Sequence, residues 1–192
     1  TVHDGGPSRP DAPWDDHPVR IGAGVSLDLS GEWINDRARP VSGERSDPVA
    51  GIMPGRVAIS SPTGIEFGQG SSISVDSGAW IDPAGRLLAG DALLAETGNR
   101  SGDTSALISL KVSAGDDRSP ATGALVPNSR FPVADTRLQL PARMSGYGFD
   151  NGARLALAAA RVDIGDGVPA APNGIALTPA FFRAGGFSGY EI

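Results

Sequence analysis

Short runs in which apolar and polar residues alternate recur along most of the chain. The clearest are Val25–Leu29, Val57–Ile59, Ser72–Val75, Leu107–Val112, Leu138–Leu140 and Leu155–Leu157. A period of two places alternate side chains on opposite faces of a strand. Gly, Asn, Asp and Ser separate the runs, and Gly and Asn tolerate the positive φ that tight turns need. The pattern predicts an all-β chain from residue 19 to residue 192, built from many short strands.

Several segments depart from this rhythm. Residues 1–18 hold four Pro and both His without any period, which predicts a linker or disordered segment. Residues 36–55 and 114–136 are rich in Pro, Ser, Arg and Asp, and we expect both to be loop insertions on the surface. The alanine-rich stretch at 153–160 has helical composition, but it is short and follows an Asn-Gly turn. We therefore predict a strand there.

An internal repeat indicates how the strands are organised. Ser30-Gly-Glu-Trp-Ile-Asn35 and Ser77-Gly-Ala-Trp-Ile-Asp82 share one pattern, and each follows an alternating run. Repeats, short strands and only 6% aromatic residues favour a solenoid, in which each coil packs on its neighbours. An antiparallel β-sandwich is the alternative fold, although a sandwich usually has longer strands and bulkier core residues.

Composition excludes several classes of function. The 192 residues carry a net charge of −6 with a single lysine, Lys111, so the chain lacks the basic cluster that nucleic acids or anionic membranes require. No apolar run approaches the roughly 18 residues of a membrane span. The absence of Cys removes disulfides, thiolate zinc sites and Cys nucleophiles. The chain begins without Met and ends in a strand-forming run, and we expect it to be part of a longer protein.

Three segments resemble the large filamentous haemagglutinin family exoproteins. The first is Gly24-Val-Ser-Leu-Asp-Leu-Ser-Gly-Glu-Trp-Ile-Asn-Asp36, to which the similar stretch Ser71-Ser-Ile-Ser-Val-Asp-Ser-Gly-Ala-Trp-Ile-Asp82 belongs. The second is Met144-Ser-Gly-Tyr-Gly-Phe-Asp-Asn-Gly-Ala-Arg-Leu-Ala-Leu157, and the third is Leu177-Thr-Pro-Ala-Phe-Phe-Arg-Ala-Gly-Gly-Phe-Ser-Gly-Tyr190. Together they extend over residues 20–192 in the family's order. The chain departs from the family in having the single Gly152 where a Gly-Gly pair is common and in its long insertion at 114–136.

The resemblance implies a right-handed parallel β-helix, an internal or C-terminal part of the shaft of a surface protein exported by two-partner secretion. It implies a location outside the cell or on the bacterial surface, although no signal peptide opens this sequence. The implied partners are host-cell surface or glycan receptors, other bacterial cells, and the outer-membrane transporter that exports the parent protein.

Candidate chemistry in the sequence is sparse. We predict no catalytic residue, no cofactor and no metal site, because the two His lie in the Pro-rich segment and the acidic clusters lack calcium-loop spacing. Trp33 and Trp80 are candidates for surface recognition or for fastening neighbouring coils. Asp28, Asp76 and Asp82 could line one face of a coil, as carboxylates do in enzymes that cleave polysaccharides.

The expected function is that of a non-catalytic structural or adhesive segment. Two alternatives stay open. One is a β-helical polysaccharide lyase or hydrolase that uses the three carboxylates. The other is a small carbohydrate-binding module that uses the two tryptophans.

Overall fold

The fold is all-β, with sheets of mainly parallel strands. The computed structural model describes residues 18–37, 52–90, 92–93, 106–112, 116–118, 125–127, 136–171 and 173–192. In this part of the chain, nine of the eleven strand pairings are parallel. The parallel pairing disagrees with the antiparallel sandwich that the sequence left as an alternative. The linker predicted at residues 1–18 lies outside the described residues except for Pro18.

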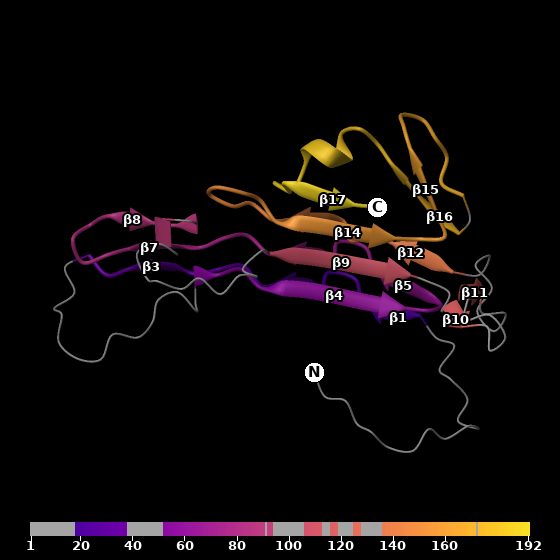
Figure 1. Ribbon diagram of the computed structural model, residues 1–192, viewed down its shortest axis with the longest axis horizontal. Helices are drawn as coiled ribbons and strands as arrows, with labels where there is room; N and C mark the ends of the chain where they lie inside the picture. The colour runs from indigo at the N-terminus through magenta and orange to yellow at the C-terminus, as the bar shows by residue number, and fades with distance from the viewer. Residues whose placement is uncertain are drawn as a thin grey trace, which may run out of the picture.

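Three sheets carry most of the strands (Figure 1). Sheet 1 consists of β1 (Val19–Ile21), β5 (Gly64–Phe67) and β12 (Arg137–Gln139). Sheet 2 consists of β2 (Ser26–Asp28), β6 (Ser72–Ser74) and β13 (Arg143–Ser145). Sheet 3 consists of β4 (Arg56–Ser61), β9 (Leu107–Val112), β14 (Arg154–Ala158) and β17 (Gly189–Glu191).

Smaller sheets complete the structure. The side sheet pairs β3 (Trp33–Asn35) with β7 (Ala79–Ile81), and β7 with the short antiparallel β8 (Leu87–Leu88). The parallel pair β15 (Arg161–Ile164) and β16 (Gly174–Leu177) follows sheet 3, and β16 contacts β12. A 3₁₀ helix, η2 (Phe181–Arg183), precedes β17.

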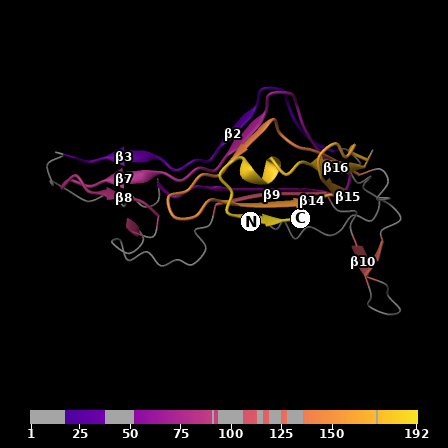
Figure 2. The same ribbon diagram turned by 90° about the horizontal axis from the view of Figure 1, so that it is seen from above.

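The chain visits the three sheets in turn. After β1, β2 and β4 it returns with β5, β6 and β9, and again with β12, β13 and β14. Each returning strand pairs in parallel with its predecessor in the same sheet, for example Leu27 with Ile73 and Ile73 with Met144. Seen from above, sheets 1, 2 and 3 enclose a common interior (Figure 2). We call one passage through these sheets a circuit.

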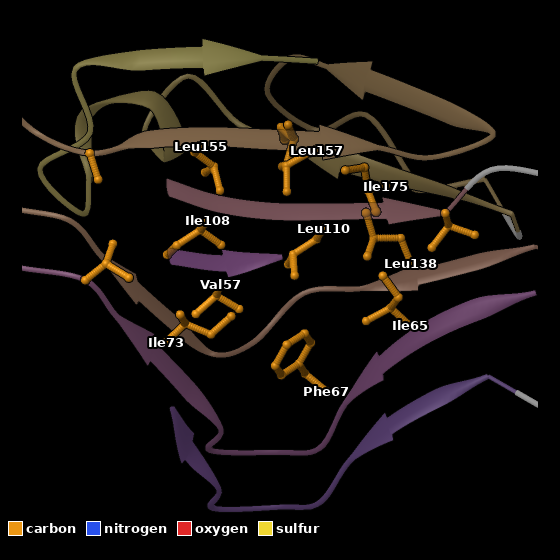
Figure 3. Packing of buried hydrophobic residues seen from close by; sticks show 14 of the residues in the cluster. Val57, Ile65, Phe67, Ile73, Ile108, Leu110, Leu138, Leu155, Leu157 and Ile175 are labelled. Carbon is orange, nitrogen blue, oxygen red and sulfur yellow. The ribbon is translucent and has the colours of Figure 1, made fainter. Parts of the chain in front are cut away.

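The core consists of apolar side chains that stack from one circuit to the next. Paired positions of sheet 3 form two ladders, and sheets 1 and 2 add one each. Figure 3 labels members from each of these sheets, such as Ile108, Ile65 and Ile73. The ladders are Val57 with Ile108 and Leu155; Ile59 with Leu110 and Leu157; Ile65 with Leu138; and Leu27 with Ile73 and Met144. Since burying one such side chain fully is worth about 1.5–3 kcal/mol, these ladders supply the main stabilisation.

An aromatic cluster closes the core at the last circuit. Phe181, Phe182 and Phe187 pack against the core together with Tyr190, and the Phe182 and Tyr190 rings meet edge to face with centroids 5.0 Å apart. The Tyr190 hydroxyl donates a hydrogen bond to the Phe182 carbonyl at 3.1 Å, and burial raises the pKa of Tyr190. Both views place η2 over the end of the interior (Figures 1 and 2).

The strand predictions agree closely with the structure. Each of the six alternating runs contains or overlaps an observed strand, and Leu107–Val112 matches β9 exactly at both ends. The alanine-rich stretch forms β14, as predicted, with Leu155, Ala156 and Leu157 buried. Tertiary pairing with β9 and β17 therefore prevails over the helical propensity of alanine.

The two predicted insertions need correction. Within 114–136 the structure forms β10 (Asp116–Arg118) and β11 (Leu125–Pro127), an antiparallel pair that we did not predict. Asp116–Arg118 is entirely charged and Leu125–Pro127 entirely apolar, so neither strand shows the alternation on which the predictions depended. Within 36–55, Ile52 is buried at 2% exposure, so this end of the insertion is not a surface loop. The remainder of both insertions lies largely outside the described residues.

Candidate functional site

The two repeat tryptophans occupy opposite environments. Trp33 is 66% exposed, whereas Trp80 is 2% exposed and packs with Ile52 and Leu93. The Trp80 indole N–H donates a hydrogen bond to Asp36 Oδ2 at 3.0 Å. Trp80 thus fastens the side sheet from within, and the two rings do not form the shared surface that the carbohydrate-module alternative requires.

The sequence motif and the strand pairing repeat with spacings that differ by one residue, and this difference places the two tryptophans in different environments. The sequence motif repeats after 47 residues, but strand register aligns Trp33 with Ala79 and Ile34 with Trp80, a repeat of 46. A shift of one residue in a strand turns each side chain to the opposite face. This shift explains why Trp33 lies outside and Trp80 inside.

The glycine of the motif has a clear structural role. Gly31 and Gly78 lie against each other and against neighbouring backbone: the Gly31 N–H donates to the Asp76 carbonyl at 2.8 Å, and the Gly78 N–H to the Ile52 carbonyl at 3.0 Å. A Cβ at Gly31 would lie 2.5 Å from the Gly78 nitrogen. The repeat therefore preserves a close approach of backbones between circuits.

Trp33 contributes to an exposed aromatic pair. Its ring centroid lies 5.6 Å from that of Phe149, which belongs to the connection between β13 and β14 and is 45% exposed. Trp33 could be predicted as a candidate from its repeat, but Phe149 could not, because the two residues are 116 positions apart and only the stacking of the circuits brings them together.

Asp28, Asp76 and Asp82, the carboxylates of the lyase or hydrolase alternative, each belong to a separate set of hydrogen bonds. Asp28 accepts a hydrogen bond from the Ser30 N–H at 3.0 Å, and bonds from the Ser30 side chain and backbone lower the pKa of Asp28. Asp76 accepts bonds from the Ser74 and Ser145 hydroxyls and, at 2.7 Å, from the Tyr147 N–H. Asp76 thereby joins the second and third circuits.

Asp82 is buried and paired with Arg86. Its carboxylate accepts bonds from the Arg86 backbone N–H at 2.8 Å and from Arg86 Nε at 2.7 Å. Burial disfavours the charged form, but the hydrogen bonds and the Arg86 charge outweigh it, so the pKa of Asp82 is lowered. These contacts close the turn between β7 and β8, and they give Asp82 a structural task.

Acid sensitivity follows from the lowered pKa of Asp82. A depressed folded-state pKa stabilises the protein above the ordinary value of 3.8, and this contribution is lost as pH falls through the folded-state pKa. We expect Asp82→Asn to be less stable than the parent at pH 7 and the difference to disappear in strong acid. Chemical denaturation from pH 7 to about pH 2 measures both curves.

The control for this measurement is Glu32→Gln, which removes one negative charge from an exposed side chain near the same sheet. We expect its stability to follow that of the parent protein across the pH range. A constant difference between Asp82→Asn and the parent at every pH would show that the ionised carboxylate contributes nothing to folding.

A groove runs along β13. Its volume is about 600 Å³, and one wall is β13 with its approach from Leu140, whereas the other is the segment from Phe181 to Phe187. Ile73, Met144 and Phe187 line it together with the serines of β6 and β13. This groove could not be predicted from the sequence, because its walls come from two circuits, and the motifs at Met144–Leu157 and Leu177–Tyr190 do not show that these segments lie side by side.

The groove has one charged lining residue, Arg143. In the described part of the chain the Arg143 side chain makes no hydrogen bond or ion pair, whereas Arg20, Arg86 and Arg161 each pair with a carboxylate. Asp76 lies beside the groove, but its oxygens are bound to the Ser145 hydroxyl and the Tyr147 N–H. The groove thus combines apolar side chains, serine hydroxyls and one unpaired cation.

No group of three or more His, Asp or Glu side chains is arranged to hold a metal ion in the ranges that the structure describes, and both His lie outside them. Within the same ranges, no helix has the length and apolar character needed to cross a bilayer. Comparisons with protein-family models, with curated proteins and with solved structures find no match to this chain.

Proposed function

We propose that this chain is a non-catalytic shaft segment of a large secreted bacterial surface protein of the filamentous haemagglutinin kind, and that it is built as a right-handed parallel β-helix. The main support is the constant register of parallel strands in three sheets, with apolar ladders continuing from circuit to circuit. In such a structure each added circuit lengthens the molecule and contacts only its two neighbours. Its backbone N–H and C=O groups find their hydrogen-bond partners there. That is the mechanical requirement of a shaft.

The hydrogen bonds of the carboxylates support a structural role. Asp76 joins two circuits and Asp82 closes a turn, so both act as fixed acceptors. A polysaccharide-cleaving site needs carboxylates that face substrate and exchange protons. The proposed recognition surface is therefore the exposed exterior, where Trp33 and Phe149 form the most prominent aromatic contact.

Cell binding tests the adhesive part of the proposal. We expect the fluorescently labelled chain to bind epithelial or bacterial cells saturably and Trp33→Ala to bind roughly fivefold or more weakly, since exposed aromatic anchors dominate recognition surfaces. Leu87→Ala is the matched control, because Leu87 is also exposed at the side sheet. Equal binding by parent and Trp33→Ala would remove this surface from the proposal.

Product assays test the non-catalytic part. The parent protein and Asp76→Asn are incubated with plant and bacterial polysaccharides, and reducing ends and unsaturated products are measured. We expect no turnover with either protein. Turnover by the parent that disappears in a folded Asp76→Asn variant would favour the lyase or hydrolase alternative and overturn the proposal.

A further inference from the structure

We propose that the Asn151-Gly152 pair is a site at which the folded chain modifies itself by deamidation, and that the isoaspartate formed there opens the connection between β13 and β14. The reactants are the Asn151 side-chain amide, the Gly152 backbone nitrogen and water. The proposal depends on the local geometry of this connection and does not require the shaft function.

The pair lies in a closed bend of the backbone that water can reach. Asn151 and Gly152 belong to the connection that leads from β13 to β14. Asn151 is exposed, whereas Ala153, which follows the pair, is buried. The Ala153 N–H donates to the Gly146 carbonyl at 2.7 Å and closes the connection at its base. The reacting side chain is therefore held in solvent by a fixed frame.

Both reacting groups lack hydrogen-bond partners in the part of the chain that the structure describes. The Asn151 side chain makes no hydrogen bond there, and the Gly152 N–H donates to no acceptor. The nitrogen must lose its proton before it can attack, and an N–H that is hydrogen-bonded must first leave its acceptor. Glycine also has no Cβ that would obstruct the approach of the side chain. The local requirements for ring closure are therefore met at Asn151.

Ring closure forms one bond and breaks another. The Gly152 nitrogen attacks Cγ, the carbonyl carbon of the Asn151 side chain, and the new carbon–nitrogen bond closes a succinimide ring. The bond from Cγ to the side-chain nitrogen breaks, and this nitrogen leaves as ammonia with the proton that Gly152 gives up. A water molecule then opens the ring. Opening at the former side-chain carbonyl gives aspartate, and opening at the backbone carbonyl gives isoaspartate, in which the backbone runs through the former side chain.

A second Asn-Gly pair in the chain, Asn173-Gly174, provides the contrast. Asn173 is half-buried, and the Gly174 N–H donates to the Ala171 carbonyl at 3.0 Å. Gly174 also begins β16 and pairs with Arg161 of β15. Its nitrogen can attack only when this hydrogen bond opens. We therefore expect the folded chain to protect Asn173 and to leave Asn151 reactive.

Isoaspartate would lengthen the backbone where a neighbouring segment holds it closely. The Gly152 carbonyl accepts a hydrogen bond from the Ser188 hydroxyl at 2.6 Å, and a Cβ at Gly152 would overlap the Gly186 carbonyl oxygen. Because the space around Gly152 is already filled, an additional backbone carbon before it must displace this residue. We therefore expect the adjacent hydrogen bond from Ala153 to Gly146 to weaken in the modified chain.

Peptide mapping of the folded protein during storage at neutral pH tests the reaction. Trypsin cleaves after arginine, so Asn151 and Asn173 fall into separate fragments, residues 144–154 and 162–183. Mass spectrometry measures deamidation in each fragment, and an isoaspartyl methyltransferase detects isoaspartate in the first. We expect Asn151 to deamidate at least about tenfold faster than Asn173 in the folded protein, and the two rates to become similar in guanidinium chloride, which removes the protection.

Two variants separate the charge of the product from its backbone. Asn151→Gln should remain unmodified at this position, because its longer side chain would have to close a larger ring. Asn151→Asp has the charge of the product without the additional backbone carbon. We expect the Ala153 amide to exchange its hydrogen about fivefold or more faster in the isoaspartyl protein, purified by ion exchange, than in Asn151→Asp.

Equal rates at Asn151 and Asn173 in the folded protein would overturn the proposal, since hydrogen bonding and burial would then not govern the reaction. The same holds if folding slows Asn151 as much as it slows Asn173, relative to the unfolded chain. If the Ala153 amide exchanges alike in the isoaspartyl protein and in Asn151→Asp, the modification does not open the connection, and that half of the proposal is wrong.

Discussion

Replacing Phe67 by Ala is expected to lower the free energy of unfolding by about 3–5 kcal/mol, which is typical for truncation of a buried phenylalanine. Phe67 is 1% exposed and belongs to the core between the sheets (Figure 3). It is the largest fully buried side chain among the described residues. Truncation of Phe67 leaves a cavity, and the neighbouring Ile, Leu and Val side chains cannot move into it because the strands of their own circuits hold them in place. Urea denaturation measures the change.

Phe149→Ala is the matched control for this experiment. Phe149 is 45% exposed and contacts the Trp33 ring outside the core, so its truncation should cost less than about 1 kcal/mol. Similar losses for the two variants would show that the interior described above is not the main source of stability.

Replacing Gly31 by Ala is expected to destabilise the protein by about 3 kcal/mol or more, at the upper end of the usual cost of inserting atoms into a packed region. The new methyl group would overlap the Ile52 carbonyl oxygen and lie 2.5 Å from the Gly78 nitrogen. Both are backbone atoms, so neither can move aside by changing a rotamer. Relief requires the first two circuits to separate locally, with loss of the hydrogen bond from Gly78 to Ile52.

Gly22→Ala provides the comparison, since its new methyl group would meet only Val25 at an ordinary contact distance of 3.7 Å. We expect little change in its thermal midpoint, against a shift of several degrees or more for Gly31→Ala. If Gly31→Ala proved as stable as Gly22→Ala, the close approach of Gly31 and Gly78 would not explain the glycine of the repeat.

Prediction from the sequence succeeded where the determining interaction is local. Leu107–Val112 shows alternation over six residues, and the observed strand has those bounds. It succeeded for Arg154–Ala158 by weighing the preceding turn against alanine content. It failed for Asp116–Arg118 and Leu125–Pro127, since the first is entirely charged and the second entirely apolar, and neither shows alternation.

The candidate sites show the same division. Trp33 and Trp80 were equivalent by motif, but their burial depends on a register of 46 residues that the motif spacing of 47 does not contain. The contact of Trp33 with Phe149, and the groove between Arg143 and Phe187, join circuits that are distant along the chain. No local pattern marks such residues, because loops of unequal length set which circuit positions become neighbours.

Alternation and turn residues act over a few positions, so the amino-acid sequence is enough to predict the all-β class, the positions of the longer strands and the repeated Ser-Gly-x-Trp motif. Strand direction, register, the inward or outward placement of each tryptophan and the groove beside β13 become visible only in the folded chain. These features depend on pairing between strands 35 to 73 residues apart. The free energy of such pairing depends on how whole circuits pack together and not on any local pattern.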